Sequence, residues 1–424
     1  MQIIKYPEKA DWKKICKRPA MDMSALEAAV ANILREVKES GDQAVRRFTG
    51  MFDKVSVDEL QVSQREIKEA ALQLSPELKQ AIEQAKHNIE LFHSRQLIPV
   101  EVVETMPGVR CWRKSVAIEK VGLYIPGGTA PLFSTLLMLA VPARLAGCRE
   151  IVLCSPANRE KTIHPAILYA AQLTGVTKIY KAGGVQAIGA MAYGTETVPQ
   201  VYKVFGPGNQ YVTCAKLMIQ KDGVPIDMPA GPSEVAIYAD DTARVPFIAA
   251  DLLSQAEHGK DSQVMLVCTS ETTIGQVLEE LEKQLSELPR KEFAQQALEN
   301  SRAVLVRNER EAIDLLNEYA AEHLILSCHN AEELAEKVIN AGSVFLGHFS
   351  PESVGDYASG TNHTLPTNGY AKAYSGVSVD SFLKKITFQH LSEEGLRNIG
   401  PAVELMAEAE GLLAHKRAVS LRLQ

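Results

Sequence analysis

The stretch Ile118-Glu-Lys-Val-Gly-Leu-Tyr124 and the apolar run Leu132–Ala146 that follows it decide the fold class of this chain. The first stretch is typical of a β-strand, and the second has the length of a helix. Strands that alternate with helices build a parallel sheet covered by helices on both faces. The chain repeats this alternation over much of its length, so we predict an α/β fold.

The alternation falls into two sets, one on each side of Pro232. In the first set, the expected strands are Ile118–Tyr124, Glu150–Cys154, Lys178–Tyr180 and Val201–Phe205, and the expected helices are Leu132–Ala146, His164–Leu173, Gln186–Tyr193 and Asn209–Gln220. In the second set, the expected strands are Glu234–Tyr238, Gln263–Cys268, Ala303–Val306, Leu324–Ser327 and Ser343–Leu346. We therefore expect two open sheets, each too short to form a complete six-stranded dinucleotide-binding fold.

Both ends of the chain lie outside this alternation. Apolar residues at helical spacing predict helices from Met23 to about Thr49 and from Gln64 to about Gln96. The dipeptide Pro107-Gly108 marks the turn of a strand–turn–strand unit. Near the C-terminus, two amphipathic helices are predicted at Ser381–Leu391 and Gly395–His415. Such helices pack on their own domain or on a partner subunit, and the pattern favours neither.

The composition is that of an ordinary soluble globular protein of 424 residues, with 46% hydrophobic and 23% charged residues. This length indicates two or three domains. The net charge of −7 argues against non-specific binding to nucleic acid. The seven cysteines include no Cys-x-x-Cys pair, and we find neither a signal-peptide pattern nor a membrane-spanning run. We therefore expect a cytoplasmic protein with reduced thiols.

Three glycine-rich turns follow strands of the first set. They are Tyr124-Ile-Pro-Gly-Gly-Thr-Ala-Pro131, Gly183-Gly-Val-Gln186 and Phe205-Gly-Pro-Gly-Asn209. Open α/β sheets bind ligands at strand ends, and glycine lets a bound group approach the main chain, so the turns can form a nucleotide crevice. Tight turns also use glycine, and neither G-x-G-x-x-G nor a phosphate-loop motif occurs. These residues alone leave both interpretations open.

Two pairs of polar side chains suggest chemistry. Gln255 and His258 lie in Asp251-Leu-Leu-Ser-Gln-Ala-Glu-His-Gly259, and on a helix residues three apart share one face. Glu322-His323 sits between an expected helix and an expected strand, and it offers two proton acceptors, one suited to neutral pH. Each pair also fits an ordinary helix end, where such residues are common.

Two further segments carry candidate site residues. Ser350–Pro366 is long and poorly periodic and contains Asp356 and His363, and loops of this length are usually functional or disordered. Glu410 and His415 are five residues apart, so one face of a regular helix does not hold both.

A metal site is one use of these side chains. Gln255, His258, Asp356 and His415 offer two imidazoles, one carboxylate and one amide oxygen. This mixed set suits Zn²⁺ or another divalent ion rather than a structural Zn²⁺ site, which favours thiolates. No pair has H-E-x-x-H spacing, and each histidine alone is more often structural. Ser233, in a turn before a strand, is likewise more often a turn residue.

Six blocks of the sequence resemble the histidinol dehydrogenase family. They are Leu123-Tyr-Ile-Pro-Gly-Gly-Thr-Ala-Pro-Leu-Phe-Ser-Thr, Phe205-Gly-Pro-Gly-Asn, Asp227-Met-Pro-Ala-Gly-Pro-Ser-Glu-Val, Asp251-Leu-Leu-Ser-Gln-Ala-Glu-His-Gly, Glu322-His-Leu and Gly355-Asp-Tyr-Ala-Ser-Gly-Thr-Asn-His. The blocks follow one another at family-like separations, and the resemblance runs from about Ala25 to the C-terminus. One departure is Ala320-Ala321, where the family often has Gly-Pro.

The resemblance implies a two-step oxidation of L-histidinol to L-histidine with two NAD⁺, through an enzyme-held aldehyde. It implies that His323 takes the alcohol proton and that Glu322 activates the water that hydrates the aldehyde. It also implies that Zn²⁺ is bound by Gln255, His258, Asp356 and His415. The implied substrate contacts are these four residues together with His323, Ser233, His363 and Glu410. The implied NAD contacts are Tyr124, Gln186 and Asn209.

The resemblance also implies two incomplete Rossmann-like domains and a C-terminal tail that crosses to the partner in a homodimer. The predicted parts are an N-terminal arm at 1–20, a first α/β domain with the catalytic and metal residues at 21–122 and 233–371, a second, NAD-binding domain at 123–232, and the exchanged helical tail at 372–424. Tail exchange would place Glu410 and His415 in the partner's site.

Two other functions compete with this prediction. A metal-dependent hydrolase would use the same ligands beside a glutamate base to activate water. A non-catalytic nucleotide-binding or metabolite-binding module would leave Glu322-His323 without a task. We expect neither a nucleic-acid partner nor membrane association.

Overall fold

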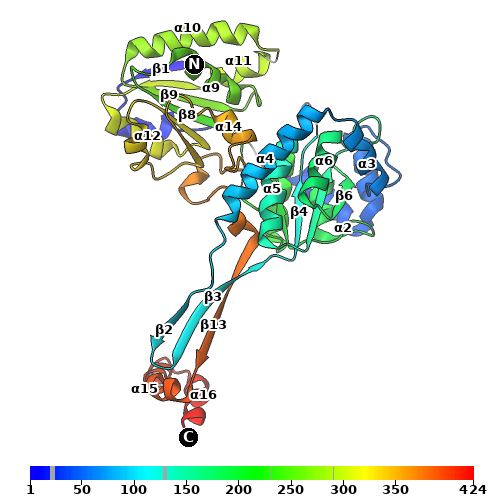
Figure 1. Ribbon diagram of the computed structural model, residues 1–424, viewed down its shortest axis with the longest axis vertical. Coiled ribbons are helices and arrows are strands. Elements are labelled where there is room, and N and C mark those ends of the chain that lie inside the picture. The colour runs from blue at the N-terminus through cyan, green and yellow to red at the C-terminus, as the bar shows by residue number, and fades with distance from the viewer. Residues whose placement is uncertain (20–23, 128–130, 230, 290) are drawn as a thin grey trace.

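The chain folds into two α/β units, each built on a parallel sheet, and a long arm that projects away from them (Figure 1). The computed structural model describes residues 1–424 except 20–23, 128–130, 230 and 290. In the described part of the chain, no helix combines the length and the apolar character that crossing a membrane requires.

The larger sheet has six parallel strands in the order β1-β10-β9-β8-β11-β12. They are β1 (Gln2–Lys5), β8 (Glu234–Ala239), β9 (Gln263–Cys268), β10 (Arg302–Leu305), β11 (His323–Ser327) and β12 (Ser343–Leu346). Successive strand residues point to opposite faces, and both faces of this sheet are apolar. One face is covered by α9 (Val245–Ala256), α10 (Glu271–Glu287) and α11 (Lys291–Glu299), the other by α1 (Lys9–Ile15), α12 (Glu309–Tyr319) and α13 (Ala331–Ala335).

The smaller sheet has four parallel strands in the order β6-β5-β4-β7. They are β4 (Lys120–Tyr124), β5 (Glu150–Ser155), β6 (Lys178–Lys181) and β7 (Lys203–Phe205). One face is covered by α2 (Ser24–Phe52), α7 (Gly184–Tyr193) and α8 (Gln210–Lys221), the other by α3 (Gln64–Leu72), α4 (Pro76–Ser94), α5 (Phe133–Ala146) and α6 (Pro165–Thr174). Counted from β4 and from β8, both units contain the order 3-2-1-4 of a partial Rossmann fold. The predicted pair of incomplete Rossmann-like units is confirmed.

The larger sheet contains one more strand than the sequence predicted. Gln2–Lys5, from the expected N-terminal arm, pairs in parallel with β10 at the edge of the sheet. Its four residues carry too short a pattern to be recognised as a strand. The sheet therefore has six strands where five were expected, but the extra strand lies beside β10 and not beside β12, so the unit is still an incomplete Rossmann-like fold.

The helices of residues 24–94 pack on the smaller sheet, which differs from the predicted grouping of 21–122 with 233–371. Val30 and Val37 of α2 join the core on one face of that sheet, and Ile82 and Ile89 of α4 join the core on the other. Helical periodicity shows which face of a helix is apolar, but it does not say which sheet that face covers.

The arm is a three-stranded antiparallel sheet that ends in two helices (Figure 1). Its strands are β2 (Val102–Met106), β3 (Val109–Ala117) and β13 (Leu383–Leu391), and its helices are α15 (Glu393–Ala409) and α16 (Leu413–Leu423). The helix predicted at Ser381–Leu391 was wrong, because β13 pairs with β3 along its whole length. Its apolar residues alternate between spacings of two and three, so the pairing partner, and not the pattern, decides the conformation.

Candidate active site

The two candidate proton acceptors, Glu322 and His323, lie at the amino end of β11. Helix α12 ends at Tyr319, and its C-cap residue, Ala320, has a left-handed backbone with φ of +53°. Glycine adopts this conformation freely, whereas an alanine there costs about 1 kcal/mol. The departure from the family pattern therefore places an alanine where the backbone favours glycine, next to the candidate acid–base pair.

The main chain of Glu234, at the start of β8, contacts both side chains. Its N–H donates to Glu322 Oε2 at 2.9 Å, and its carbonyl oxygen accepts from His323 Nδ1 at 3.2 Å. Because a carbonyl oxygen only accepts, Nδ1 carries a proton in this arrangement. Nδ1 also lies 3.6 Å from Glu322 Oε2, and both side chains are buried. One backbone position thus orients both candidate acid–base groups.

Burial perturbs the protonation of this pair. It raises the pKa of Glu322 to about 8, partly opposed by His323 and by the Glu234 N–H. Burial alone would lower the pKa of His323, but the carboxylates of Glu322, Asp356 and Glu352 outweigh it and raise that pKa to about 10. A carboxyl group that titrates near neutral pH is suited to proton transfer.

Three of the four predicted metal ligands come together around His323. Gln255 Nε2 lies 3.5 Å from His323 Nδ1, and Asp356 Oδ1 lies 3.2 Å from His323 Nε2. Asp356 belongs to α14 (Glu352–Tyr357). Burial would raise the pKa of Asp356, but the hydrogen bond and charge of His323, together with the charge of His258, lower it. Gln255, His258 and Asp356 therefore share one environment.

Gln255 and His258 do not lie on one face of a helix, although the sequence predicted that they would. Helix α9 ends at Ala256, and the His258 N–H donates to the Gln255 carbonyl oxygen at 3.2 Å, past the helix end. The two residues therefore do not share a helix face. The helix end places Gln255 in its last turn and His258 in the loop that leads to β9.

The donor set fits a divalent cation. Gln255 Oε1 is buried and has no hydrogen-bond partner among the described residues. An unpaired amide oxygen beside a carboxylate and an imidazole provides ligands that such ions accept. Within the described ranges, however, no group of three or more His, Cys, Asp or Glu residues is placed to hold a metal ion. Gln255, His258 and Asp356 together offer three donors, one fewer than the four of a typical Zn²⁺ site.

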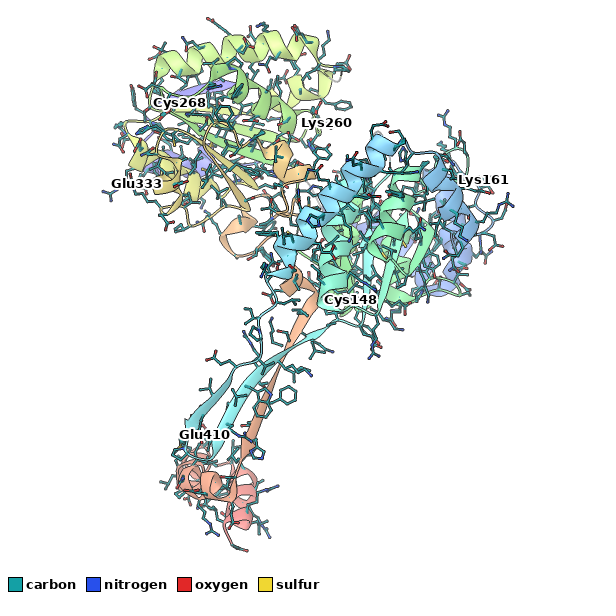
Figure 2. The ribbon with its side chains drawn as sticks, in the orientation of Figure 1. Cys148, Lys161, Lys260, Cys268, Glu333 and Glu410 are labelled. Carbon is teal, nitrogen blue, oxygen red and sulfur yellow. The ribbon has the colours of Figure 1, made fainter. Side chains whose placement is uncertain are left out.

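The structure does not bring Glu410 and His415 to this site within one chain. Glu410 follows α15 and His415 lies in α16, and both side chains are exposed. Figure 2 shows Glu410 at the far end of the arm, remote from Lys260, which lies two residues after His258. An exchange between subunits would be needed to unite the two groups.

The loop after α14 ties the site to the smaller unit. His363 Nδ1 donates to the Asp356 carbonyl oxygen at 2.7 Å, and its Nε2 accepts from the Thr135 hydroxyl of α5 at 2.9 Å. Burial lowers the pKa of His363, which favours the neutral ring that this pattern requires. Ser233, directly before Glu234, has a half-buried side chain. The candidate site therefore lies where the two units meet.

The predicted cofactor contacts line a separate cleft of 1010 Å³ at the carboxyl edge of the smaller sheet. The Tyr124 hydroxyl accepts from the Gly184 N–H at 3.0 Å, and Asn209 Oδ1 accepts two main-chain N–H groups at the start of α8. Gln186 is buried in α7, and neither atom of its amide has a partner in the described part of the chain. The cleft thus joins helix N-termini to free hydrogen-bonding groups, which fits a nucleotide. Residues 128–130 of the first glycine-rich turn lie outside the described residues.

The residues that line the cleft include a carboxylate, Asp53, that the sequence did not indicate. Asp53 Oδ2 is buried without a hydrogen-bond partner among the described residues, and burial raises the pKa of this carboxyl group to about 6. A Cβ atom added at Gly183 would lie 3.2 Å from Asp53 Oδ2 and 2.7 Å from Pro156 Cβ. The close approach explains the glycine at this turn.

Sequence reasoning also missed three charged residues beside the acid–base pair. Glu352 is buried and accepts from the Ser254 hydroxyl, and burial raises its pKa to about 8. Arg18 and Glu234 form a buried ion pair. Only Glu234 had a local signal, because it belongs to one of the family-like blocks, whereas Arg18 and Glu352 resemble surface residues in the sequence.

Comparisons with known proteins agree on one family. The family model described as histidinol dehydrogenase matches residues 16–423. A histidinol dehydrogenase of Bacteroides thetaiotaomicron is 61% identical over 423 residues, which cover 100% of this chain and 99% of that protein. A chloroplastic histidinol dehydrogenase of Oryza sativa subsp. japonica is 54% identical over 410 residues, 96% of this chain and 86% of that protein. The crystal structure of histidinol dehydrogenase from Elizabethkingia anophelis matches with a TM-score of 0.98 at 54% identity, covering 100% of this chain and 98% of that one.

Proposed function

This chain belongs to the histidinol dehydrogenase family of oxidoreductases, and on that premise we propose that it oxidises L-histidinol to L-histidine, through L-histidinal, in two NAD-dependent steps of histidine biosynthesis. The observation that carries the proposal is the buried pair Glu322 and His323, held side by side by the main chain of Glu234. Two successive oxidations need two proton acceptors with separate tasks. The cofactor cleft has no use in a metal-dependent hydrolase, which the full-length identity also disfavours.

His323 takes the proton of the substrate alcohol in the first oxidation. Its Nδ1 proton is directed at the Glu234 carbonyl oxygen, which orients the ring and leaves Nε2 on the side of Asp356. We assign the uptake of the alcohol proton to Nε2. Because the neighbouring carboxylates raise the pKa of His323 to about 10, the ring accepts that proton only after it has lost the proton on Nε2. When bound, NAD⁺ would supply the hydride acceptor for each oxidation.

Glu322 takes a proton from the water that hydrates the aldehyde. The Glu234 N–H holds Glu322 Oε2 at 2.9 Å and leaves Oε1 free for that water. Because burial raises its pKa to about 8, this carboxyl group has a higher affinity for a proton than an exposed glutamate. This property suits a general base that works near neutral pH.

Gln255, His258 and Asp356 would hold a Zn²⁺ ion together with His415 of the partner subunit. The unpaired Gln255 Oε1 and the lowered pKa of Asp356 support this assignment. When bound, Zn²⁺ would hold the imidazole and amino nitrogens of the substrate, and so orient it more than polarise it.

The remaining contacts divide between substrate and cofactor. On the substrate side, Gln255, His258, Asp356 and His323 are joined by Ser233, His363 and the partner's Glu410 and His415. On the cofactor side are Tyr124, Gln186 and Asn209, which line the cleft. The unpaired amide of Gln186 is the contact that the cleft supports most directly.

Exposed apolar residues of the arm support a homodimer with an exchanged tail. Leu405, Met406 and Leu413 are 69%, 66% and 65% exposed. Apolar side chains gathered on a projecting segment are typical of an interface. All seven cysteines are free thiols, and six of them are buried, which supports a cytoplasmic location.

Counting NADH tests the proposed function. We expect two NADH for each L-histidinol consumed, and a loss of turnover after prolonged chelation that Zn²⁺ restores. One NADH per substrate would reject the two-step scheme, and no NADH from L-histidinol would reject the assignment as a whole. Turnover that survives complete removal of the metal would reject only the zinc dependence.

Mixing two inactive variants tests the shared site. We expect Glu322→Gln and His415→Ala homodimers each to lack the complete reaction. Under tail exchange, a mixed dimer carries both lesions in one site and none in the other, so subunit mixing should restore up to about half of the native activity per dimer. Activity that stays absent, although mass spectrometry detects mixed dimers, would contradict the exchange.

A further inference from the structure

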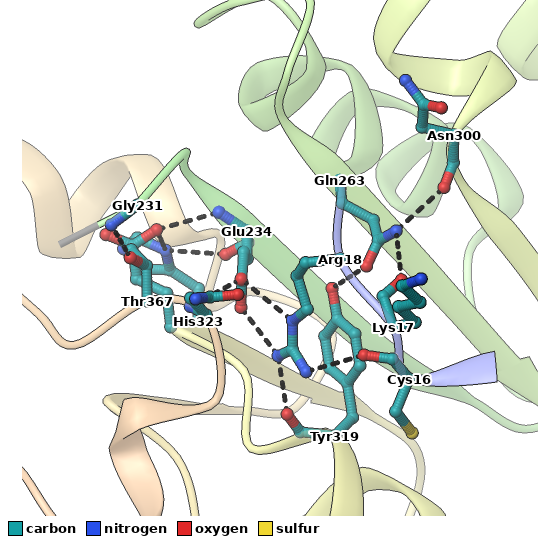
Figure 3. A network of polar contacts seen from close by, with 12 residues as sticks. Cys16, Lys17, Arg18, Gly231, Glu234, Gln263, Asn300, Tyr319, His323 and Thr367 are labelled. Carbon is teal, nitrogen blue, oxygen red and sulfur yellow. Dashed lines mark hydrogen bonds and ion pairs between the residues drawn. The ribbon is translucent and has the colours of Figure 1, made fainter. Parts of the chain in front are cut away.

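Arg18 and Glu234 form a buried ion pair close to His323 (Figure 3). Arg18 Nε donates to Glu234 Oε1 at 3.0 Å, and Nη2 donates to Oε2 at 2.9 Å. Glu234 Oε1 also accepts from the Asn368 N–H at 2.7 Å. A bidentate guanidinium–carboxylate pair defines an orientation as well as a distance. The side chain of Glu234 is therefore held from two directions.

The same residue holds the acid–base pair through its main chain. The Glu234 N–H donates to Glu322 Oε2, and its carbonyl oxygen accepts from His323 Nδ1. Rotation of this peptide would break the contacts of both side chains. The ion pair with Arg18 opposes that rotation because it anchors the side chain of the same residue.

Arg18 also holds the segment that precedes Glu322. Its Nη2 donates to the Tyr319 carbonyl oxygen at 2.6 Å, its guanidinium carbon lies 3.7 Å from the centre of the Tyr319 ring, and its Nη1 donates to the Cys16 carbonyl oxygen at 3.0 Å. Tyr319 is the last residue of α12, three positions before Glu322. One guanidinium group therefore contacts both segments that orient the pair, the start of β8 and the end of α12.

We infer that Arg18 is a positioning residue for the reaction, which aligns Glu322 and His323 through Glu234 and Tyr319. The inference rests on the proposed function, because it assigns the two acid–base groups their tasks. A displacement of about 1 Å in a reacting group can lower a rate by about a hundredfold. Arg18 contacts Cys16, Glu234 and Tyr319 and does not line the cofactor cleft, so we expect its effect to fall on turnover and not on substrate affinity.

The variant Arg18→Lys keeps the charge and removes the planar, two-pronged donor. We expect kcat with L-histidinol to fall by about ten- to a hundredfold, while KM for L-histidinol and for NAD⁺ changes by less than about threefold. The matched control is Arg307→Lys, since Arg307 donates to Glu8 and to the Tyr6 carbonyl oxygen of the same N-terminal segment. This control should keep the native kcat.

A double-mutant cycle separates positioning from general destabilisation. In the Glu322→Gln background, Arg18→Lys should lower the oxidation of supplied L-histidinal much less than it does in the native protein, because its effect passes through Glu322. Equal losses in both backgrounds would overturn the inference. If Arg18→Lys fails to fold, the double variant Arg18→Met with Glu234→Gln replaces it, since no unpaired buried charge is left.

Two outcomes are decisive for the role of Arg18. Native kcat in folded Arg18→Lys, or in the folded double variant, would overturn it. If the native protein makes no NADH from L-histidinol, the proposed function fails separately. A crystal structure of Arg18→Lys then decides the positioning role, which is overturned if Glu234 N and Glu322 Oε2 remain at hydrogen-bond distance.

Discussion

The two sheets offer opposite edges to their ligands. In the smaller sheet, the turns after β4, β6 and β7 line the cleft at the carboxyl edge, where open α/β sheets usually bind ligands. In the larger sheet, Glu322, His323 and Gln255 gather at the amino edge, beside the ends of α9 and α12. Both sheets have the same partial Rossmann order, so the order alone does not choose the edge.

The two edges differ in electrostatic character. The cleft lies at the N-termini of α7 and α8, where the positive ends of the helix dipoles favour anions such as phosphates. The amino edge lies at the C-termini of α9 and α12, where carbonyl groups favour cations. The buried carboxylate of Asp356, whose pKa is lowered, adds negative charge to this edge, and the buried carboxyl groups of Glu322 and Glu352, with pKa values of about 8, add it only as they ionise. One sheet edge therefore suits a nucleotide, and the other suits a metal ion and an imidazole.

Substitutions in the acid–base pair should have the largest effect and should spare the cofactor cleft. His323→Ala removes the proposed acceptor of the alcohol proton, so we expect alcohol oxidation to fall by about a thousandfold or more. Glu322→Gln should lower the oxidation of supplied L-histidinal by about a hundredfold and alcohol oxidation much less. Stopped-flow measurement of NADH formation with each substrate checks both. The Kd for NAD⁺, measured by calorimetry, should stay within about twofold of the native value in both variants. Equal losses of alcohol and aldehyde oxidation in Glu322→Gln would contradict the division of tasks.

A methyl group added at the cofactor cleft should have an effect of intermediate size, and it should change KM for NAD⁺ instead of kcat. The added Cβ of Gly183→Ala would lie 2.7 Å from Pro156 Cβ and 3.2 Å from Asp53 Oδ2, so the cleft must shift. We expect KM for NAD⁺ to rise by about tenfold while kcat at saturating NAD⁺ stays near the native value. Gly50→Ala is the matched control, because among the described residues its added Cβ meets nothing within 4 Å beyond its own stretch of helix. A lowered kcat with an unchanged KM would show that the cleft and the acid–base pair are not independent.

Asp53 should produce the smallest effect, a pH dependence of stability. Its pKa is about 6 in the folded state and about 3.9 in an unfolded chain. The folded state therefore binds the proton more tightly, and the free energy of unfolding falls as pH rises from about 4 to about 6. Asp53→Asn removes this loss, so its Tm should exceed the native value by about 2 °C at pH 7 and by less at pH 4.

Calorimetry at the two pH values measures this difference in Tm. The control is Asp58→Asn, whose parent side chain is 88% exposed. A difference between Asp53→Asn and native protein that is the same at pH 4 and pH 7 would contradict burial as the cause of the raised pKa.

Much of the site was accessible from the sequence because it lies in distinctive local blocks. Glu322, His323, Gln255, His258 and Asp356 belong to such blocks, and the structure brings them into one environment. The dimer and the metal stay predictions. Glu352 and Arg18 escaped notice because a buried charge is recognised by its surroundings, and those come from segments far apart in the chain.

The sequence by itself determined the positions of the α/β strands and most helices, because burial on both faces of a parallel sheet leaves short apolar runs at regular intervals. Tertiary structure alone decided that Gln2–Lys5 extends the larger sheet and that Leu383–Leu391 is a strand. It also decided which sheet the helices of residues 24–94 cover. The local pattern of a segment shows its secondary structure. The neighbour that the segment packs against is selected by contacts and hydrogen bonds with residues far away in the chain. The same long-range contacts place the acid–base pair at the amino edge of the larger sheet.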